Sequence, residues 1–329
     1  MELQDIAPNI CSGRDKPSHN GKVILYGSTG VIGMTESASY LDELILVARV
    51  GANAGQLQVA NSPCGVTDNA LVINAHEWNA YIYYYLQYYN LNRLVFGSGQ
   101  PLITGGMLKK IKIKSGKNVE RLKITHLLSL LDQRIETQKK VIEDLKRLKY
   151  AISKRVFAEM GQHHPVVKLG QLCSIKTGKL DANAMIDNGE FPFFTCARED
   201  YRTDTYAFEG DSLLISGNGD IGIVKRYNGK FNAYQRTYVL QDFIQEIAYV
   251  QCFVEHHLPK RVLKEKNVGA MPYIVLSTLS EMPIILPPTY IQNAICKAIG
   301  TISEQINVEE KILANFELQK QYNLSMMFI

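Results

Sequence analysis

The feature that most constrains this chain is an internal repeat with a spacing of about 170 residues. Similar runs recur in the same order when the second half is shifted back onto the first. The matched runs are 44–47 with 213–215, 51–55 with 217–222, 67–72 with 234–239 and 81–86 with 249–254. A spacing this long is typical of a domain repeat rather than of a solenoid unit. We therefore expect two copies of one unit, each a globular α+β domain followed by a long helix.

Each globular domain is expected to contain a mixed β-sheet. In the first copy, short apolar or β-branched runs are bounded by Gly, Asn or Ser turns, which is typical of strands. These runs are 23–26, 44–48, 70–73 and 111–113. Segment 76–90 predicts a helix, because its tyrosines at 81, 84, 85 and 88 follow helical spacing. We expect that tyrosine stripe to pack in the core rather than to stack on bases.

Each copy then ends in a heptad pattern, which predicts a coiled coil. Apolar residues step by three and four from Leu128 to Val156, and again from Ile299 to Met327 in the same phase. The interface positions expected on the first helix are Leu131, Ile135, Gln138, Ile142, Leu145, Lys149 and Ile152. Those expected on the second helix are Ile302, Ile306, Glu309, Leu313, Phe316 and Lys320.

Charge at the seam predicts the orientation of the two helices. A parallel pairing sets Lys149 against Lys320, which is a like-charge contact. An antiparallel pairing instead sets Lys149 opposite Glu309 and Gln138 opposite Lys320. We therefore predict an antiparallel rod, with a length of about 43 Å at 1.5 Å per residue. The predicted domains are a globular domain at 1–117, a helix at 118–160, a second globular domain at 165–288 and a second helix at 289–329.

The distribution of charge indicates a polyanionic partner or a solvated helix face. The chain carries a formal charge of +4. Fifteen Lys or Arg and five Asp or Glu lie between Leu108 and Arg155, so the rest of the chain is about −6. Charge alone does not separate the two interpretations.

Composition favours a folded cytoplasmic protein. Apolar residues make up 46% and charged residues 21%, as in globular domains. No apolar run approaches the ~20 residues of a membrane-spanning helix, and no secretion signal is evident. Six scattered cysteines without a C-x-x-C pair predict reduced thiols, and neither a disulfide framework nor a metal site is expected.

One constellation supports an enzyme instead. A predicted strand leads into Gly27-x-x-Gly30-x-x-Gly33, and Tyr150-x-x-x-Lys154 follows about 120 residues later. Together these motifs resemble the NAD(P)-dependent short-chain dehydrogenases, in which the glycines let a helix N-terminus approach the cofactor pyrophosphate. The heptad around Tyr150 and the internal repeat both disfavour this alternative.

A different resemblance covers essentially the whole chain. The run from Leu128 to Ile152 resembles the conserved helix of type I restriction–modification specificity subunits. Val23–Gly33 and Val47–Gly55 resemble the Gly-rich turns of their target-recognition domains, and 111–113 and 282–288 resemble the strand before each conserved helix. The order of recognition domain, helix, recognition domain, helix is that of the family.

The resemblance implies a non-catalytic protein that recognises double-stranded DNA. Each recognition domain would read one half of a split target in the major groove, and the helices would set the gap. Two modification (methyltransferase) subunits and restriction subunits would be its partners. S-adenosylmethionine, ATP and magnesium would belong to those partners, and this chain would hold no cofactor.

Polar residues on the Gly-rich turns are the candidate DNA contacts, since base and phosphate contacts need such side chains on loops over a rigid scaffold. In the first domain they are Ser28, Thr29, Arg49, Asn53, Asn69 and Gln100. Lys109, Lys110, Lys112 and Lys114 alternate as on a strand face and are expected to contact phosphates. In the second domain they are Arg198, Asn218, Lys225, Arg226, Gln235 and Arg236. A coiled-coil adaptor that binds no DNA remains a third interpretation.

Overall fold

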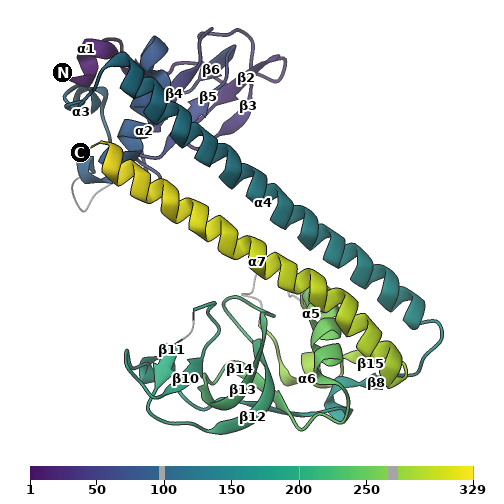
Figure 1. The fold of residues 1–329 in the computed structure, drawn as a ribbon. Coiled ribbons are helices and arrows are strands. Elements are labelled where there is room, and N and C mark those ends of the chain that lie inside the picture. Colours follow the sequence, from purple (N-terminus) through teal and green to yellow (C-terminus); the bar gives the residue numbers. More distant parts are fainter. Residues whose placement is uncertain (96–100, 200, 266–272, 329) are drawn as a thin grey trace. The chain divides into compact units, whose positions relative to one another are not determined.

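The computed structural model describes residues 1–95, 101–199, 201–265 and 273–328. The chain forms two compact units (Figure 1). Unit 1 comprises Met1–Lys139 and Lys311–Ile329, and unit 2 comprises Lys140–Glu310. Each of the two long helices, α4 (Asn118–Met160) and α7 (Thr289–Met327), contributes one part to each unit. The two units are described separately.

Unit 1 contains two sheets. A four-stranded antiparallel sheet has the order β1 (Cys11–Ser12), β7 (Ala70–Ile73), β4 (Leu44–Ala48) and β5 (Leu57–Ala60). A three-stranded sheet has the order β3 (Val31–Thr35), β2 (Val23–Tyr26) and β6 (Cys64–Val66). In the second sheet, β2 is antiparallel to β3 and parallel to β6. The mixed sheet expected from the sequence is therefore present.

Short helices complete unit 1. They are α1 (Leu3–Ile6), a 3₁₀ turn at His76–Trp78, α2 (Asn79–Tyr89), a 3₁₀ turn at Leu91–Leu94 and α3 (Gly105–Lys109). Tyr81, Tyr84 and Tyr85 of α2 are each 5% exposed in the core. The hydroxyls of Tyr81 and Tyr85 donate to the carbonyl oxygens of Lys114 and Lys112, at 2.7 and 2.9 Å. The prediction that the tyrosine stripe is core is confirmed for these three residues.

The strand predicted at 111–113 is wrong. This segment forms one isolated bridge, between Glu2 and Lys112, flanked by hydrogen bonds from Leu3 to Ile111 and from Ile113 to Met1. The pairing stops there because Leu3 begins α1. Lys109 is the last residue of α3, so Lys109 and Lys110 do not lie on an alternating strand face.

Unit 2 contains a six-stranded sheet and a two-stranded sheet. The six strands follow the order β11 (Tyr201–Thr203), β10 (Phe191–Phe194), β13 (Val224–Ala233), β12 (Phe208–Ser216), β14 (Thr237–Gln241) and β9 (Ser174–Thr177). The smaller sheet pairs β8 (Val166–Lys168) with β15 (Pro283–Ile285). The helical elements are 3₁₀ turns at Leu169–Gln171 and Ala182–Ala184, α5 (Ile247–Glu265) and α6 (Leu276–Ser280).

The strand pairing of unit 2 repeats that of unit 1, which confirms the duplication. Parallel β2 and β6 place Tyr26 opposite Val66, and parallel β10 and β13 place Phe194 opposite Ala233. The neighbours of β4, which are β5 and β7, recur as β13 and β14 on either side of β12. In unit 2 the single strand β13 pairs with both β12 and β10, whereas in unit 1 β5 pairs with β4 and β6 pairs with β2.

A glycine marks the same close approach in each unit. A Cβ atom at Gly13 would overlap the carbonyl oxygen of Val66, and a Cβ atom at Gly178 would overlap that of Ala233. Both glycines lie beside the last residue of the strand that pairs in parallel, β6 or β13. The repeat is therefore retained in backbone packing although few residue types are shared.

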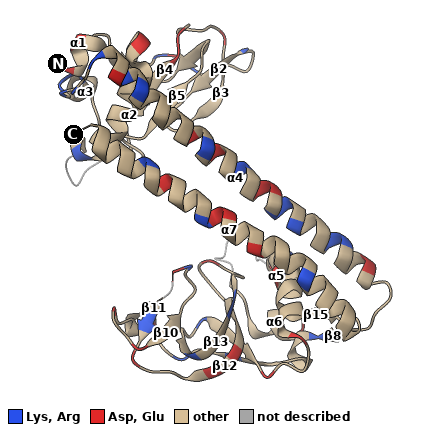
Figure 2. Cartoon of the chain, viewed as in Figure 1, with Lys and Arg blue, Asp and Glu red and all other residues tan. Residues whose placement is uncertain are grey.

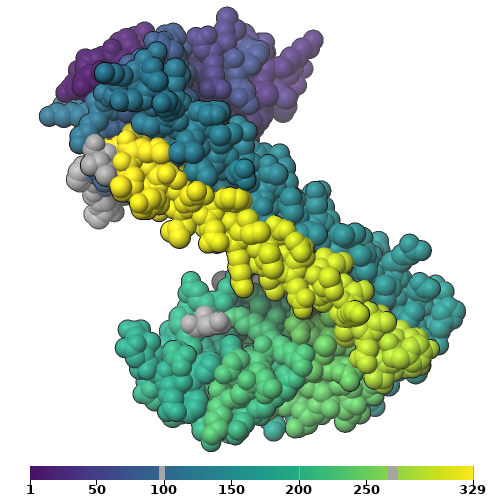
Figure 3. Space-filling model, viewed as in Figure 1, coloured from purple at the N-terminus to yellow at the C-terminus, as the bar shows by residue number. Residues whose placement is uncertain are grey.

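The long helices pair in an antiparallel sense. In unit 1, Lys139 lies 3.2 Å from Glu317, and Asp132 lies 2.6 Å from Lys320, so residue numbers rise along α4 as they fall along α7. In unit 2, Lys146 contacts Glu310 at 2.6 Å. The space-filling view shows the two helices side by side, in teal and yellow (Figure 3). The predicted orientation is confirmed.

The polar pairs predicted at the seam are wrong. Lys149 forms its ion pair with Glu255 of α5 at 3.0 Å rather than with Glu309, whose carboxylate accepts from Gln305. Lys320 pairs with Asp132 rather than with Gln138. Heptad phase could not reveal either partner, because Glu255 comes from α5 and Asp132 is held in place by the Tyr84 hydroxyl of α2 at 3.0 Å.

All thirteen predicted interface positions are buried or half-buried. The fully buried members are Leu131, Ile135, Ile142 and Ile306. The half-buried members are Gln138, Leu145, Lys149, Ile152, Ile302, Glu309, Leu313, Phe316 and Lys320. Burial of the apolar members accounts for most of the stability of such a helix pair.

Candidate nucleic-acid interface

In unit 1, hydrogen bonds hold three loops at the ends of neighbouring strands. We call residues 27–30, 49–56 and 67–69 the first loop cluster. The amide of Thr67 donates to the carbonyl oxygen of Tyr26 at 3.0 Å, and the side-chain amide of Gln58 donates to that of Gly27 at 2.7 Å. The amide of Arg49 donates to the carbonyl oxygen of Asn69 at 3.0 Å. Loops fixed in this way can present polar side chains in defined positions.

The structure brings most of the predicted DNA contacts of unit 1 to this cluster. Thr29, Asn53 and Asn69 are exposed, while Ser28 and Arg49 are half-buried. Lys109 and Lys110 lie elsewhere, at the end of α3. Gln100 lies outside the described residues. Five of the eight residues predicted for the first domain therefore belong to one set of connected loops.

Unit 2 carries an equivalent set, residues 195–199, 217–223 and 234–236, which we call the second loop cluster. The amide of Tyr234 donates to the carbonyl oxygen of Phe194, and that of Gly217 donates to that of Arg236, each at 2.9 Å. The cluster contains Arg198, Asn218, Gln235 and Arg236. Arg198, Gln235 and Arg236 are exposed, and Asn218 is half-buried.

The remaining predicted residues of unit 2 lie on β13 and differ from one another in their contacts. The ammonium of Lys225 donates to the carbonyl oxygen of Arg198 at 2.8 Å, so Lys225 adjoins the second loop cluster. Two nitrogens of Arg226 instead donate to both carboxylate oxygens of Asp211, at 2.9 and 2.5 Å. The hydrogen bonds from Arg226 lower the pKa of Asp211 below its usual value. Arg226 is thus engaged on the sheet, away from the loops.

The basic segment divides into a paired and an unpaired part. Along α4, Lys139, Lys146 and Lys149 have acidic partners within their own units. No ion pair is recorded among the described residues for the lysines before and at the start of α4, which are Lys109, Lys110, Lys112, Lys114, Lys117 and Lys123. Figure 2 shows how basic and acidic residues alternate along α4. Much of the excess charge of this segment therefore lies at residues 109–123 of unit 1, which motif analysis did not single out in full.

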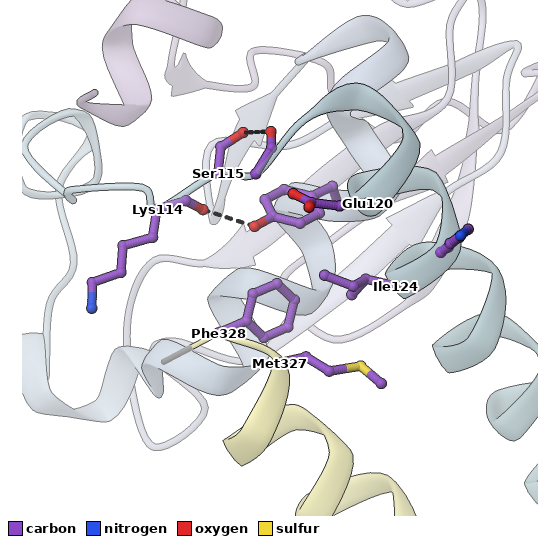
Figure 4. A pocket seen from close by; sticks show the side chains of 9 residues that line it. Lys114, Ser115, Glu120, Ile124, Met327 and Phe328 are labelled. Atoms are coloured by element: carbon purple, nitrogen blue, oxygen red, sulfur yellow. Dashed lines mark hydrogen bonds between the residues drawn. The ribbon is translucent and has the colours of Figure 1, made fainter.

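Next to these lysines, unit 1 has a hollow of about 530 Å³, lined by Lys114, Glu120 and Lys123 together with the end of α7. Met327 and Phe328 point toward it opposite Ile124 (Figure 4). Phe328 is 2% exposed, and its ring centroid lies 5.3, 5.4 and 5.6 Å from those of Tyr81, Tyr85 and Tyr88. The hollow adjoins a packing contact, and nothing in its lining indicates catalytic chemistry.

The glycine motif of the dehydrogenase hypothesis forms a β-hairpin. The amide of Gly27 donates to the carbonyl oxygen of Gly30 at 2.8 Å, and Gly33 lies within β3 opposite Leu25. A pyrophosphate site requires the N-terminus of a helix after the glycines. Here a strand follows, so this motif does not form a dinucleotide site.

The Tyr-Lys half of that hypothesis fails as well. Tyr150 lies on α4 in unit 2, and its ring stacks on His256 at 5.1 Å. A hydrogen bond with Lys260, rather than with Lys154, is the main cause that lowers the pKa of Tyr150. Tyr150 is therefore part of a contact between α4 and α5.

Two further classes of site find no support among the described residues. No set of three His, Cys, Asp or Glu side chains converges in a way that could hold a metal ion. No described helix is both long and apolar enough to cross a membrane. The polar residues of the two loop clusters thus remain as the principal candidate site of each unit.

Comparison with known proteins identifies the family. The model of the type I restriction modification DNA specificity domain matches residues 9–147 and again residues 164–318. The chain belongs to the type I restriction–modification DNA specificity family. Its two matches agree with the two copies of the fold. The dehydrogenase alternative has no support.

Named relatives and a solved structure agree with the family. The chain is 35% identical to the EcoDI specificity subunit of Escherichia coli over 140 residues, which are 43% of this chain and 31% of that protein. It is 29% identical to the MpnII specificity subunit of Mycoplasma pneumoniae over 46% of this chain and 47% of that protein. The chain thus spans about a third to a half of the length of these relatives.

The fold is similar to that of a solved specificity subunit. The crystal structure of a type I restriction–modification S subunit from M. genitalium matches with a TM-score of 0.70 and 16% identity, over 100% of this chain and 95% of that one. A chain from a structure that addresses complex assembly and conformational transition of the type I R-M system matches with a TM-score of 0.53 and 13% identity, over 100% and 96%. At these identities the similarity concerns the fold.

Proposed function

We propose that this protein is the DNA-recognition subunit of a type I restriction–modification complex and has no catalytic activity of its own. The observation that carries the proposal is the equivalent loop cluster in each unit of a chain that belongs to the specificity family. Two copies of one recognition surface suit a target with two separate halves. Each unit reads one half in the major groove, where the edges of the four base pairs differ.

The residues proposed to contact DNA follow from their positions. Ser28, Thr29, Arg49, Asn53 and Asn69 serve unit 1, and Arg198, Asn218, Lys225, Gln235 and Arg236 serve unit 2. Gln100 stays in the proposal as a prediction from the sequence. Arg226 also stays, but it must release Asp211 before it can contact DNA.

Lysines outside the loop clusters are proposed to bind phosphates. Lys109 and Lys110 belong to the group of lysines at residues 109–123 for which no ion pair is recorded among the described residues. Cations that lack an acidic partner bind a phosphate without first breaking an ion pair. Such contacts position the protein on the duplex and carry no sequence information.

The paired helices are proposed to set the gap between the two half-sites and to dock two modification (methyltransferase) subunits. Restriction subunits complete the complex in the cytoplasm, where its DNA lies. S-adenosylmethionine, ATP and magnesium are proposed to belong to these partner subunits.

Methylation-site sequencing of DNA from cells that express the chain with its modification subunits tests the proposal. We expect a split motif with two specific halves. Methylation that shows no motif, or nicotinamide-dependent turnover by the purified chain, would overturn the proposal.

The salt dependence of DNA binding separates this function from that of an adaptor that binds no DNA. Phosphate contacts release counterions, so the affinity for duplex DNA is expected to fall about 10³-fold or more between 50 and 200 mM salt for six or more contacts. Changing Lys109, Lys110 and Lys112 together to Ala is expected to reduce that slope. A matched triple change of the ion-paired Lys139, Lys146 and Lys149 to Ala is the control, which leaves the slope unchanged.

A further inference from the structure

The two loop clusters contain the same pair of backbone segments, joined in the same way. In unit 1, the amide of Arg49 donates to the carbonyl oxygen of Asn69 at 3.0 Å, and the carbonyl oxygen of Arg49 accepts from Ile103 at 2.9 Å. In unit 2, Gly217 makes the same two bonds, to Arg236 at 2.9 Å and from Ile274 at 2.8 Å. Arg49 therefore occupies the place of Gly217, and Asn69 the place of Arg236.

Each unit thus has one arginine in this hydrogen-bonded pair of residues. The arginine is the donor residue in unit 1 and the acceptor residue in unit 2. Unit 1 carries its arginine at the end of β4, whereas unit 2 carries its arginine on the turn between β13 and β14. The first position is closed in unit 2, because a Cβ atom at Gly217 would lie 2.5 Å from the carbonyl oxygen of Arg236. Since the two positions are hydrogen-bonded neighbours, a long side chain from either one can reach the same region.

Both of these guanidinium groups are also available. Neither Arg49 nor Arg236 has a side-chain hydrogen bond or ion pair with any described residue. By contrast, Arg198 lies 3.5 Å from Asp220, and Arg226 is bound to Asp211 through two nitrogens. A bidentate contact with a base uses two of the five N–H donors of a guanidinium, and these two must be free.

We propose that Arg49 and Arg236 are equivalent specificity-determining residues, each of which donates two hydrogen bonds to O6 and N7 of a guanine in its own half of the target. A planar fork of donors matches this pair of acceptors, and the contact is the commonest specific one between a protein and DNA. The assignment rests on the proposed function, and it adds that each half of the split target contains a guanine read by a single arginine.

Selection of binding sites from a randomised duplex library by the full chain tests the assignment. The wild-type chain is expected to select two separated halves with a guanine in each. Arg49→Ala is expected to reduce the preference for guanine in one half by roughly 10- to 100-fold and to leave the other half unchanged. Arg236→Ala is expected to have the same effect on the opposite half. Each variant is thus the control for the other. Arg261→Ala, which removes an arginine paired with Glu265 on α5, controls for loss of positive charge alone.

Replacing each selected guanine with 7-deazaguanine removes one of the two proposed acceptors. The wild-type chain is expected to lose about 5-fold or more in affinity at each position, and the matching alanine variant is expected to show no further loss. If the wild-type chain selects a split motif and neither variant alters a guanine, the assignment is wrong while the proposed function stands. If the wild-type chain selects no motif, the proposed function fails and the assignment fails with it.

Discussion

The contact between α4 and α7 in unit 1 depends on a charged group that can be tested quantitatively. The ammonium of Lys320 lies 2.6 Å from Asp132, whose other oxygen accepts from the Tyr84 hydroxyl at 3.0 Å. The Lys320 ammonium also lies 5.6 Å from the centre of the Tyr84 ring. The side chains of Lys320 and Asp132 are 17% and 35% exposed, so this ion pair is only partly screened by water.

A double-mutant cycle with Lys320→Met and Asp132→Asn isolates the interaction of the two charges. Exposed ion pairs contribute ~0.2–1 kcal/mol, and breaking a fully buried pair costs ~3–5 kcal/mol. Because the carboxylate is about one-third exposed, we expect a coupling energy between these two ranges, ~1–2 kcal/mol. Asn retains an acceptor for the Tyr84 hydroxyl, so the cycle measures charge rather than loss of that hydrogen bond.

Trp78 makes the measurement specific to unit 1. It is the single tryptophan of the chain, and the Arg121 guanidinium lies over its ring at the start of α4. Urea unfolding of the full chain, followed by tryptophan fluorescence, therefore reports on unit 1 without interference from unit 2. Each kcal/mol should also shift the melting temperature of a unit of this size by about 2–4 °C.

The exposed pair Lys139–Glu317 provides the control cycle in the same unit, with side chains that are 57% and 51% exposed. Its coupling energy should be at most ~0.5 kcal/mol, and 1 M salt should reduce it further. If the coupling energy of Lys320 and Asp132 is no larger than that of this control pair, the half-buried ion pair does not hold α7 against α4 in unit 1.

Four further predictions concern the core of unit 1, helix α7, a close backbone approach in unit 2 and the sheet of unit 2. Phe328→Ala should destabilise unit 1 by ~3 kcal/mol in the same fluorescence assay, while Phe328→Leu should retain most of the stability. Gly300→Ala should raise the free energy of unfolding in urea by ~0.5–1 kcal/mol, since a Cβ atom at this position in α7 would meet no atom within 4 Å. Gly178→Ala should instead lower the melting temperature of unit 2, measured by circular dichroism, because a Cβ atom there would overlap the carbonyl oxygen of Ala233. Asp211→Ala should lower the free energy of unfolding of unit 2 by at most ~1 kcal/mol at pH 7. Because Arg226 lowers the pKa of Asp211, this contribution should be present above pH 3.8 and should be lost as the pH falls below that value. Melting curves recorded at a series of pH values measure it.

The repeat and the helices could be predicted because both depend on periodicity within the sequence. Recurring runs predicted the duplication, and helical spacing predicted the tyrosine face of α2 and the heptads of α4 and α7. These inferences rest on patterns within the sequence and required no knowledge of a contact between distant parts of the chain. The antiparallel direction was instead predicted from charge at the seam, and the direction is confirmed although the polar pairs used to predict it do not form.

Partners that come from a third element could not be predicted in this way. Lys149 was expected to meet Glu309, but α5 supplies Glu255. Arg226 was expected to be available on a turn, but β12 supplies Asp211. The Gly27–Gly33 motif also fits either a helix start or a hairpin, and the pairing of β2 with β3 and β6 decides which one forms.

The division of the chain has a consequence for its biosynthesis. Unit 1 draws on Met1–Lys139 and on Lys311–Ile329, so the whole of unit 2 is inserted within it. Leu324 and Phe328 belong to the same buried cluster as Leu3 and Tyr81. A ribosome therefore completes every residue of unit 2 before it makes the segment that closes the core of unit 1. The N-terminal unit, although begun first, is the last to reach its final packing, and until then the aromatic face of α2 lacks the covering that α7 provides.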